Sequence, residues 1–296
     1  MKRTLGKARE SRGFNLFYLP ALLLIAFFII YPFCNAVYVS FFKWNGYSSS
    51  MKYVGFKNYL TMFSDSVFKK SFENTLIYGF GSSLIDVVFG LMLALFLNQR
   101  FPGGNLVRAI IYLPVLISGL VMGYIMYFIF QYSHGALNDV MLLAGAPMVD
   151  WLADSKRSVL IITLINSWQF VGNTMLIFLA GLQGIPVHLY EAAELDGADA
   201  WHRFSEVTLP LLMPSTTSAV TLNLIGGLKL YEIIVALTGG GPAKSTHSLS
   251  SFIENQYFSA EKAGYAAAVG VFSFIFIMII ANISNSWLKR KERKLL

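Results

Sequence analysis

Six long apolar runs, separated by polar segments, dominate the pattern of hydrophobic and polar positions along the chain. Each run is long enough for a membrane-spanning helix, which needs about 20 apolar residues. Within a run such as 21–30 the apolar residues are continuous, whereas the strands of a membrane β-barrel alternate apolar and polar residues. The pattern therefore predicts an all-α integral membrane protein, because helices satisfy every backbone polar group in lipid. The predicted spans are residues 14–42, 74–99, 106–132, 158–183, 207–237 and 264–288.

The first run, 14–42, contains no charged residue. It is longer than the apolar region of a secretory signal, which has about 7–15 residues, so we expect an uncleaved first helix. The composition agrees with a membrane protein, since 55% of residues are hydrophobic and only 13% are charged, against about 25% charged in soluble domains. These values exclude a soluble enzyme and a disordered chain. Cys34 is the single cysteine, so an intrachain disulfide is excluded as well.

Basic residues gather at the two ends of the chain, in segments 1–13 and 289–296. Ten of the 23 Lys and Arg residues lie there, and the positive-inside rule then places both termini in the cytoplasm. Arg100 and Arg108 fall in a short turn on the same side and agree with this orientation, whereas five lysines between residues 43 and 73 oppose it. Topology alone explains the basic ends, so we expect a lipid bilayer around the chain and no nucleic-acid partner.

The loop between the fourth and fifth spans, 184–206, has an unusual composition for a cytoplasmic connection. It carries five of the chain's 16 acidic residues. Pro186 suits the first turn of a helix, and Gly197 can turn the chain between two short helices. An ordered amphipathic pair of helices on the cytoplasmic face is typical of a docking surface for a partner protein.

This loop resembles the EAA motif of ABC importer permeases. In that family the loop forms a coupling helix seated in a cleft of the ATPase, and Gly197 corresponds to the motif's central glycine. Leu209-Pro210 and Pro214 extend the match beyond the loop. The residues that the resemblance assigns to ATPase coupling are Glu191, Ala192, Ala193, Asp196, Gly197, Ala198 and Phe204.

Other segments resemble the carbohydrate-uptake, maltose-permease-like branch of that family. They are residues 18–21, 40–46, 237–242 and 264–268. The resemblance implies a type I ABC importer permease fold in a bacterial or archaeal plasma membrane, and a carbohydrate substrate, with an oligosaccharide as the expected class. It also implies a second homologous permease, two ATPase subunits and an extracellular solute-binding protein. ATP and Mg would be held by the partner ATPase, so no cofactor is expected in this chain.

Polar residues inside the fourth and fifth spans are candidates for the substrate path, because such residues are costly in lipid. Asn166, Gln169 and Asn173 occur at i, i+3 and i+7, on one face of the fourth span. In the family the sugar site lies on the two helices that flank the coupling loop. Hydrogen bonding between helices explains each of these residues equally well. The remaining candidates are Trp168, Asn223, Gly226, Gly227, Lys229, Tyr231 and Glu232.

Asp86 lies near the middle of the second span and belongs to no motif. A central Asp costs about 2.5–3.5 kcal/mol on membrane insertion, which the apolar residues of the span outweigh. We therefore predict that Asp86 is buried against a neighbouring helix or subunit, and Lys229 is one candidate partner for its carboxylate.

Catalytic motifs are missing from the sequence. The four histidines lack metal-ligand spacing, and the glycine-rich segment 238–245 has Thr238 and Ala243 where a phosphate loop requires glycine. We therefore expect a non-catalytic transport subunit whose energy comes from another polypeptide. Two alternatives stay open, namely an ion-coupled secondary transporter and an ABC permease for a solute other than a sugar. An intramembrane enzyme or receptor is a weaker rival, because Asp86 alone does not form a catalytic set.

Overall fold

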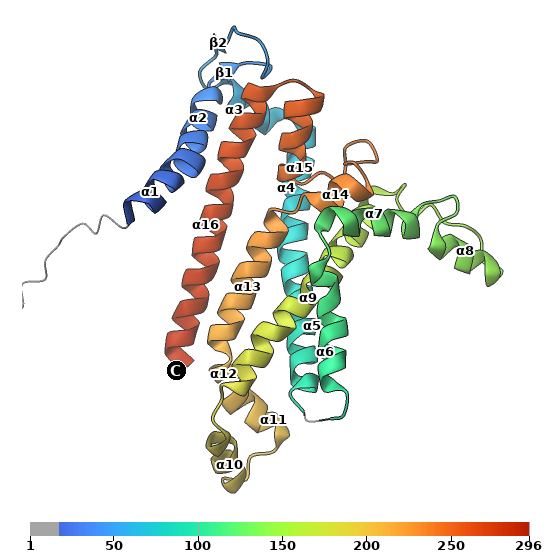
Figure 1. Ribbon diagram of the computed structural model, residues 1–296, viewed down its shortest axis with the longest axis vertical. Coiled ribbons are helices and arrows are strands. Elements are labelled where there is room, and N and C mark those ends of the chain that lie inside the picture. Colours follow the sequence, from blue (N-terminus) through green and yellow to red (C-terminus); the bar gives the residue numbers. More distant parts are fainter. Residues whose placement is uncertain (1–17, 100, 296) are drawn as a thin grey trace, which may run out of the picture.

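The computed structural model describes residues 18–99 and 101–295, and these form a bundle of long helices with short elements at both ends (Figure 1). The N-terminal basic segment 1–13 and Arg100 lie outside the described residues. Four helices are long and apolar enough to cross a membrane. They are the α1–α2 helix Leu19–Val39, the α4–α5 helix Ser66–Leu97, α9 (Ser155–Gln183) and α16 (Ala263–Leu295).

Two of these long helices contain a π-helical turn. The first consists of α1 (Leu19–Ile25), the π-turn Ala26–Ile30 and α2 (Tyr31–Val39), and the second of α4 (Ser66–Leu76), the π-turn η3 (Ile77–Gly81) and α5 (Ser82–Leu97). α16 continues without a break through the basic residues 289–294, so this part of the predicted tail is helical. Lys291 Nζ lies 4.3 Å from the ring centre of Trp287 on the same helix.

The predicted spans 106–132 and 207–237 are wrong as single continuous helices. α6 (Gly104–Tyr112) and the 3-10 turn Leu113–Leu116 meet α7 (Gly119–Phe130) at an angle of 98°. Pro114 lacks an amide donor, the backbone of Ile117 and Ser118 is extended, and Ser118 caps the N terminus of α7. The second break follows α12 (Leu209–Leu211), which is bent by 64° from α13 (Met213–Leu228).

α13 ends at Leu228, well before the predicted end of the fifth span. Residues 229–231 are not helical, and α14 (Glu232–Leu237) begins after them. Short helices α8 (Ala136–Leu143) and α15 (Leu249–Glu254) lie at the same end of the bundle as α14 (Figure 1). A two-stranded antiparallel ladder of β1 (Phe42–Lys43) and β2 (Lys52–Tyr53), together with α3 (Lys57–Ser64), completes that end, which we call the β end.

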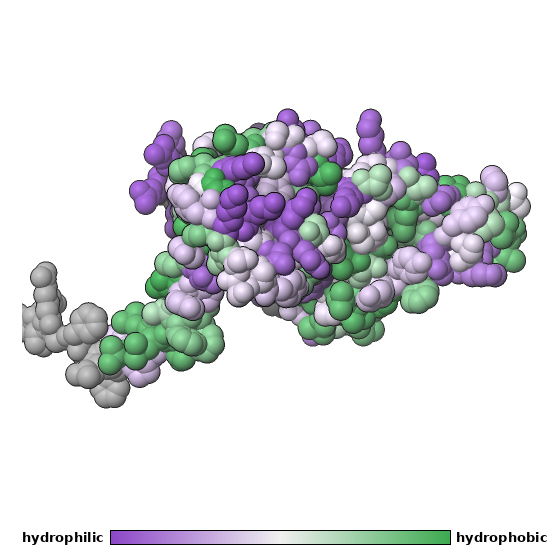
Figure 2. All heavy atoms as spheres, turned by 90° about the horizontal axis from the view of Figure 1, so that it is seen from above, coloured by the Kyte–Doolittle hydropathy of each residue, from purple (hydrophilic) through white to green (hydrophobic). Residues whose placement is uncertain are grey.

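The opposite end of the bundle carries the loop 184–206 and the C-terminal part of α16 (Figure 1). The loop folds as α10 (Val187–Leu195), α11 (Ala200–His202) and the π-turn η5 (Arg203–Thr208). We call this the loop end. Figure 2 looks onto the β end and shows hydrophilic side chains gathered over it, with hydrophobic side chains on the flanks. This distribution is the one expected of a helix bundle in a bilayer.

The core of the bundle is formed by α5, α9 and α13, which pack against one another. Two glycines allow the close approach of α13 to η3, because Gly227 lies against the Tyr78 carbonyl and Gly79 lies against Leu228. In contrast, α1 contains no buried residue, and the α1–α2 helix leans away from the bundle (Figure 1). This arm therefore presents an almost wholly apolar surface outside the core.

Candidate functional site

A cleft of about 370 Å³ opens between α5, α9, α13 and the non-helical residues 229–231. It brings together Asp86 and nine of the ten candidates for the substrate path. The missing candidate is Trp168, which is 49% exposed and lies outside the cleft lining, one position before Gln169 on α9. The predicted residues that line the cleft are Asp86, Asn166, Gln169, Asn173, Asn223, Gly226, Gly227, Lys229, Tyr231 and Glu232.

Two interruptions of helical backbone border this cleft, one at Ile117 before α7 and the other at residues 229–231 between α13 and α14. At the first break, the Nε2 of Gln169 donates a hydrogen bond to the carbonyl of Ile117, with a distance of 2.7 Å. At the second, the hydroxyl of Ser248 donates to the carbonyl of Leu230, with a distance of 2.6 Å. Irregular backbone at membrane depth is tolerated where it is buried in protein or lines a cavity. At both breaks, a side chain from another element thus donates a hydrogen bond to a backbone carbonyl outside the regular helix.

Glu232 lies beside the N terminus of α7. A Cβ added to Gly119, the first residue of that helix, would come 3.0 Å from the Cβ of Glu232. A helix N terminus carries partial positive charge and favours a nearby carboxylate. The absence of a side chain at Gly119 therefore allows Glu232 to sit where α7 stabilises its charge.

The amides of the cleft divide into two groups. Gln169 bonds to Ile117, and the Nδ2 of Asn223 donates to the Thr174 hydroxyl at 2.7 Å, so both link neighbouring elements. Within the described residues, neither Asn166 nor Asn173 makes a side-chain hydrogen bond. Hydrogen bonding between elements therefore accounts for Gln169 and Asn223, whereas substrate contact by Asn166 and Asn173 stays a prediction.

Replacing Gln169 with leucine should destabilise the protein by about 1–3 kcal/mol, because the partly buried Ile117 carbonyl would lose its donor. Thermal unfolding in detergent measures this effect. The matched control is Asn173→Leu, which alters the same face of α9 without removing a hydrogen bond seen in the structure. Equal unfolding temperatures for the two variants would contradict a role of Gln169 in holding the break at Ile117.

Asp86 is 1% exposed, and the Ser167 side chain of α9 lies beside its carboxylate. Its Oδ1 has no hydrogen-bond partner among the described residues. Lys229 lines the same cleft, but no ion pair joins it to Asp86 within the described residues, so the suggested pairing is not formed here. The described residues also contain no cluster of His, Cys, Asp or Glu that could hold a metal ion.

At the loop end, α10 and α11 form an ordered surface with little packed against it. α10 contains no buried residue, and Leu195 is 89% exposed. Gly197 adopts a left-handed backbone with φ of +83°, and the Ala198 amide donates to the Ala193 carbonyl, so the turn closes α10. Of the predicted coupling residues, those exposed are Glu191, Ala192, Asp196 and Gly197, and those half-buried are Ala193, Ala198 and Phe204.

Polar contacts hold α10 against the segment that follows it. Glu194 Oε2 lies 3.3 Å from Arg203 Nη1, and the hydroxyls of Tyr190 and Thr208 are 3.1 Å apart. Asp199 caps α11 by accepting a hydrogen bond from the His202 amide. These contacts order the loop without burying it, which leaves its outer face available to a partner.

Asp199 should titrate below the ordinary range of aspartate. Hydrogen bonds from the backbone and ring of His202 lower the pKa of this exposed carboxyl. A lowered folded-state pKa means that the cap of α11 is complete above the ordinary pKa of Asp and is lost only as pH falls through the lowered value. Carboxyl NMR of the aspartate-labelled protein, assigned with Asp199→Asn, measures this. A midpoint at or above the ordinary value would contradict the cap.

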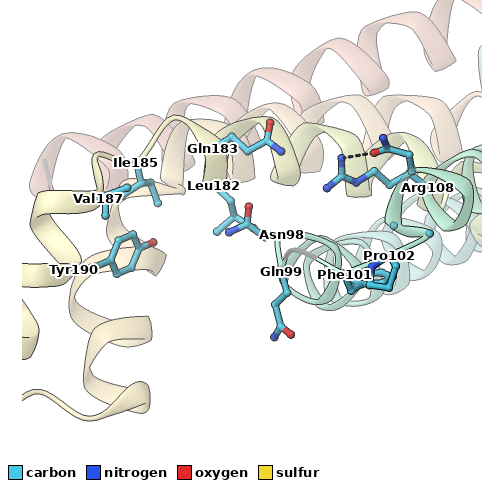
Figure 3. Close-up of a pocket in the computed structure, with 13 residues that line it drawn as sticks. Asn98, Gln99, Phe101, Pro102, Arg108, Leu182, Gln183, Ile185, Val187 and Tyr190 are labelled. Carbon is cyan, nitrogen blue, oxygen red and sulfur yellow. Dashed lines mark hydrogen bonds between the residues drawn. The ribbon is translucent and has the colours of Figure 1, made fainter.

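Two further pockets were not predicted from the sequence. One of about 950 Å³ separates the start of the loop from the turn between α5 and α6 (Figure 3). Arg108 crosses that turn and donates to the Leu97 carbonyl at 2.7 Å. The other pocket, of about 670 Å³, lies at the β end and includes Trp44, Asp65 and Tyr265. Both join segments far apart in sequence, so hydropathy and motif spacing carry no signal for them.

Comparison with known proteins places these features in a family. Residues 86–294 match the family described as "Binding-protein-dependent transport system inner membrane component". The chain is 33% identical over 272 residues to the trehalose/maltose transport system permease protein MalF of Thermococcus litoralis, covering 92% of each chain. It is 32% identical to the multiple sugar-binding transport system permease protein MsmF of Streptococcus mutans, covering 95% of this chain and 96% of that one.

The fold is also found in a crystal structure of a bacterial ABC transporter involved in the import of the acidic polysaccharide alginate. The TM-score is 0.80 with 23% identity, over 93% of this chain and 94% of that chain. The inward-facing MetNI methionine ABC transporter is more distant, with a TM-score of 0.53 and 20% identity, over 81% of this chain and 99% of that chain. The chain has the type I ABC importer permease fold and belongs to the family of binding-protein-dependent transport system inner membrane components.

Proposed function

We propose that this chain is the permease subunit of an ATP-driven carbohydrate importer, with an oligosaccharide as its substrate. The observation that carries the proposal is the polar cleft between α5, α9 and α13, in a chain whose relatives are named for maltose, starch products and multiple sugars. Amides that bond to hydroxyls, and a ring such as Tyr231 against the apolar face of a sugar, suit this class of ligand.

The proposed orientation places the loop end in the cytoplasm and the β end outside. The C terminus and the loop 184–206 share one end of the bundle (Figure 1), and the basic residues 289–294 favour the cytoplasmic side for it. The N terminus is proposed on the same side. The protein is then a multi-pass subunit of a bacterial or archaeal plasma membrane, with the solute-binding protein docking at the β end.

The proposed mechanism is alternating access driven through the loop end. α10 follows directly from α9, and η5 leads through α12 into α13, so the loop connects the two helices that contribute most residues to the cleft. Movement of an ATPase bound to α10 would therefore change the spacing of α9 and α13. Two ATPase subunits would hold ATP and Mg, and this chain would contribute no catalytic group. A second homologous permease would complete the translocation path.

Purification of this chain in mild detergent from its native cell, with partners identified by mass, tests the proposal. We expect an ATPase and a second six-span permease to co-purify. Recovery of this chain alone, with transport intact after reconstitution without an ATPase, would overturn the ABC assignment in favour of an ion-coupled secondary transporter. Recovery of the partners with uptake of an amino acid, phosphate or peptide in place of sugar would overturn only the carbohydrate assignment.

A further inference from the structure

Two buried hydrogen-bond acceptors in the cleft lack donors. They are Oδ1 of Asp86 and Oε1 of Gln169, and each residue is 1% exposed. Both residues line the cleft. Buried polar atoms in folded proteins are paired with few exceptions, and an exception calls for a specific explanation. Because Asp86 and Gln169 line the same cleft, molecules that enter the cleft can supply the donors that the two acceptors lack.

Several donors around the cleft are engaged elsewhere, and the Ser167 side chain lies beside the Asp86 carboxylate without pairing its Oδ1. The Gln169 amide N–H bonds to Ile117, and the Asn223 amide N–H bonds to Thr174. Lys229 also lines the cleft, yet among the described residues no ion pair joins its ammonium to Asp86. Donors for these two acceptors thus come from outside the chain, from water or from a bound ligand rich in hydroxyl or amine hydrogens.

The charge of the cleft limits which donor-rich ligand it accepts. Its ionisable lining consists of two carboxylates, Asp86 and Glu232, and one ammonium, Lys229, together with the phenol of Tyr231. Lys229 and Glu232 balance formally, so the lining carries a net charge of −1 only when the buried Asp86 is ionised. A like charge brought into a site of low dielectric is strongly disfavoured. A carboxylated or sulfonated sugar would bring such a charge against Asp86.

We propose that Asp86 is a specificity-determining residue, whose carboxylate accepts hydrogen bonds from hydroxyls of an uncharged sugar and excludes sugars that carry carboxylate or sulfonate groups. This inference rests on the proposed function, since it names the substrate class of the same cleft. The fold does not impose the choice, because a transporter that shares it is involved in the import of the acidic polysaccharide alginate. Adjacent sugar hydroxyls can donate to the two oxygens of one carboxylate.

The test measures sugar binding to the purified importer, with all its subunits, by saturation-transfer NMR titration without the solute-binding protein. The probes are maltotriose and cellotriose, each compared with its form oxidised at C6, in which carboxylates replace the primary alcohols. The variants are Asp86→Asn, which keeps the shape and removes the charge, and Asp86→Ala. Glu73→Gln is the matched control, because Glu73 is an exposed acid of α4 that pairs with Lys70 outside the cleft.

We expect the unmodified importer to bind a neutral trisaccharide at least tenfold more tightly than its oxidised form. Asp86→Asn should weaken neutral binding about ten- to a hundredfold, as expected for losing hydrogen bonds to a charged group, and should shrink the preference for the neutral form. Glu73→Gln should change neither value. If Asp86 only stabilised the fold, its variants would bind the neutral and the oxidised trisaccharide equally less tightly. The ratio of the two affinities would then stay unchanged.

Three results would overturn the inference. One is equal binding of neutral and oxidised sugars by the unmodified importer, which needs no variant to assemble. Another is an unchanged ratio in both Asp86 variants, which would leave the importer assignment standing and remove Asp86 from specificity. The last is no binding of any sugar by the unmodified importer, which would reject the cleft as the sugar site and contradict the proposed function itself.

Discussion

Gly227→Val should strongly destabilise the packing of the bundle. A Cβ at Gly227 would come 2.5 Å from the Tyr78 carbonyl oxygen and 2.9 Å from the Gly79 Cα. These are backbone atoms of η3, so no side-chain rotation relieves the clash, and α13 would have to separate from the α4–α5 helix. Overpacking of a core costs about 1–3 kcal/mol, and valine adds two methyl groups beyond that Cβ. We expect a loss at the upper end of this range, against a total stability of about 5–15 kcal/mol.

Gly226→Val is the matched control for this prediction. A Cβ at Gly226 meets nothing within 4 Å, so the same substitution one residue earlier in α13 should leave the folded bundle intact. Gly226 lines the cleft, and its variant can therefore alter transport without altering folding. Size-exclusion chromatography and thermal unfolding in detergent distinguish the two variants. A Gly227→Val protein that unfolds at the same temperature as Gly226→Val would contradict the packing of α13 against η3.

Gly197→Arg should abolish recovery of the ATPase with this chain while leaving the chain inserted in the membrane. The turn at Gly197 has a φ of +83°, and an L-residue in a left-handed conformation costs roughly 1–2 kcal/mol. The new side chain would also project from the exposed surface that α10 and α11 present to a partner. Strain and steric obstruction then act together at the proposed docking site, and coupled transport should fall to background.

Gly145→Arg is the matched control, because it introduces the same backbone strain at a site away from the loop 184–206. Gly145 follows α8, has a φ of +75°, and meets nothing within 4 Å of an added Cβ, as is also true of Gly197. Affinity purification of both variants, with the ATPase quantified by mass, makes the comparison. We expect normal ATPase recovery with Gly145→Arg. If Gly197→Arg retained the ATPase and transported normally, the coupling role of the loop would be rejected.

Part of the cleft lining could be predicted from the sequence. The i, i+3, i+7 spacing of Asn166, Gln169 and Asn173 predicted their common face, and all three line the cleft. Trp168 lies outside the lining, since neighbouring helical residues point about 100° apart. The pockets at Arg108 and Trp44 were missed because their walls come from segments distant in sequence.

The sequence by itself determined the membrane class, the approximate apolar segments, the loop 184–206 and the family, because hydropathy and a local motif are properties of contiguous residues. Only the tertiary structure decided where the helices break. The apolar run continues through Ile117, and the donors for the carbonyls of Ile117 and Leu230, which are Gln169 and Ser248, lie 52 and 18 residues away. The tertiary structure likewise decided that the Asp86 carboxylate lines the shared cleft without forming an ion pair with Lys229. Such pairings depend on how helices pack, which no pattern along the chain contains.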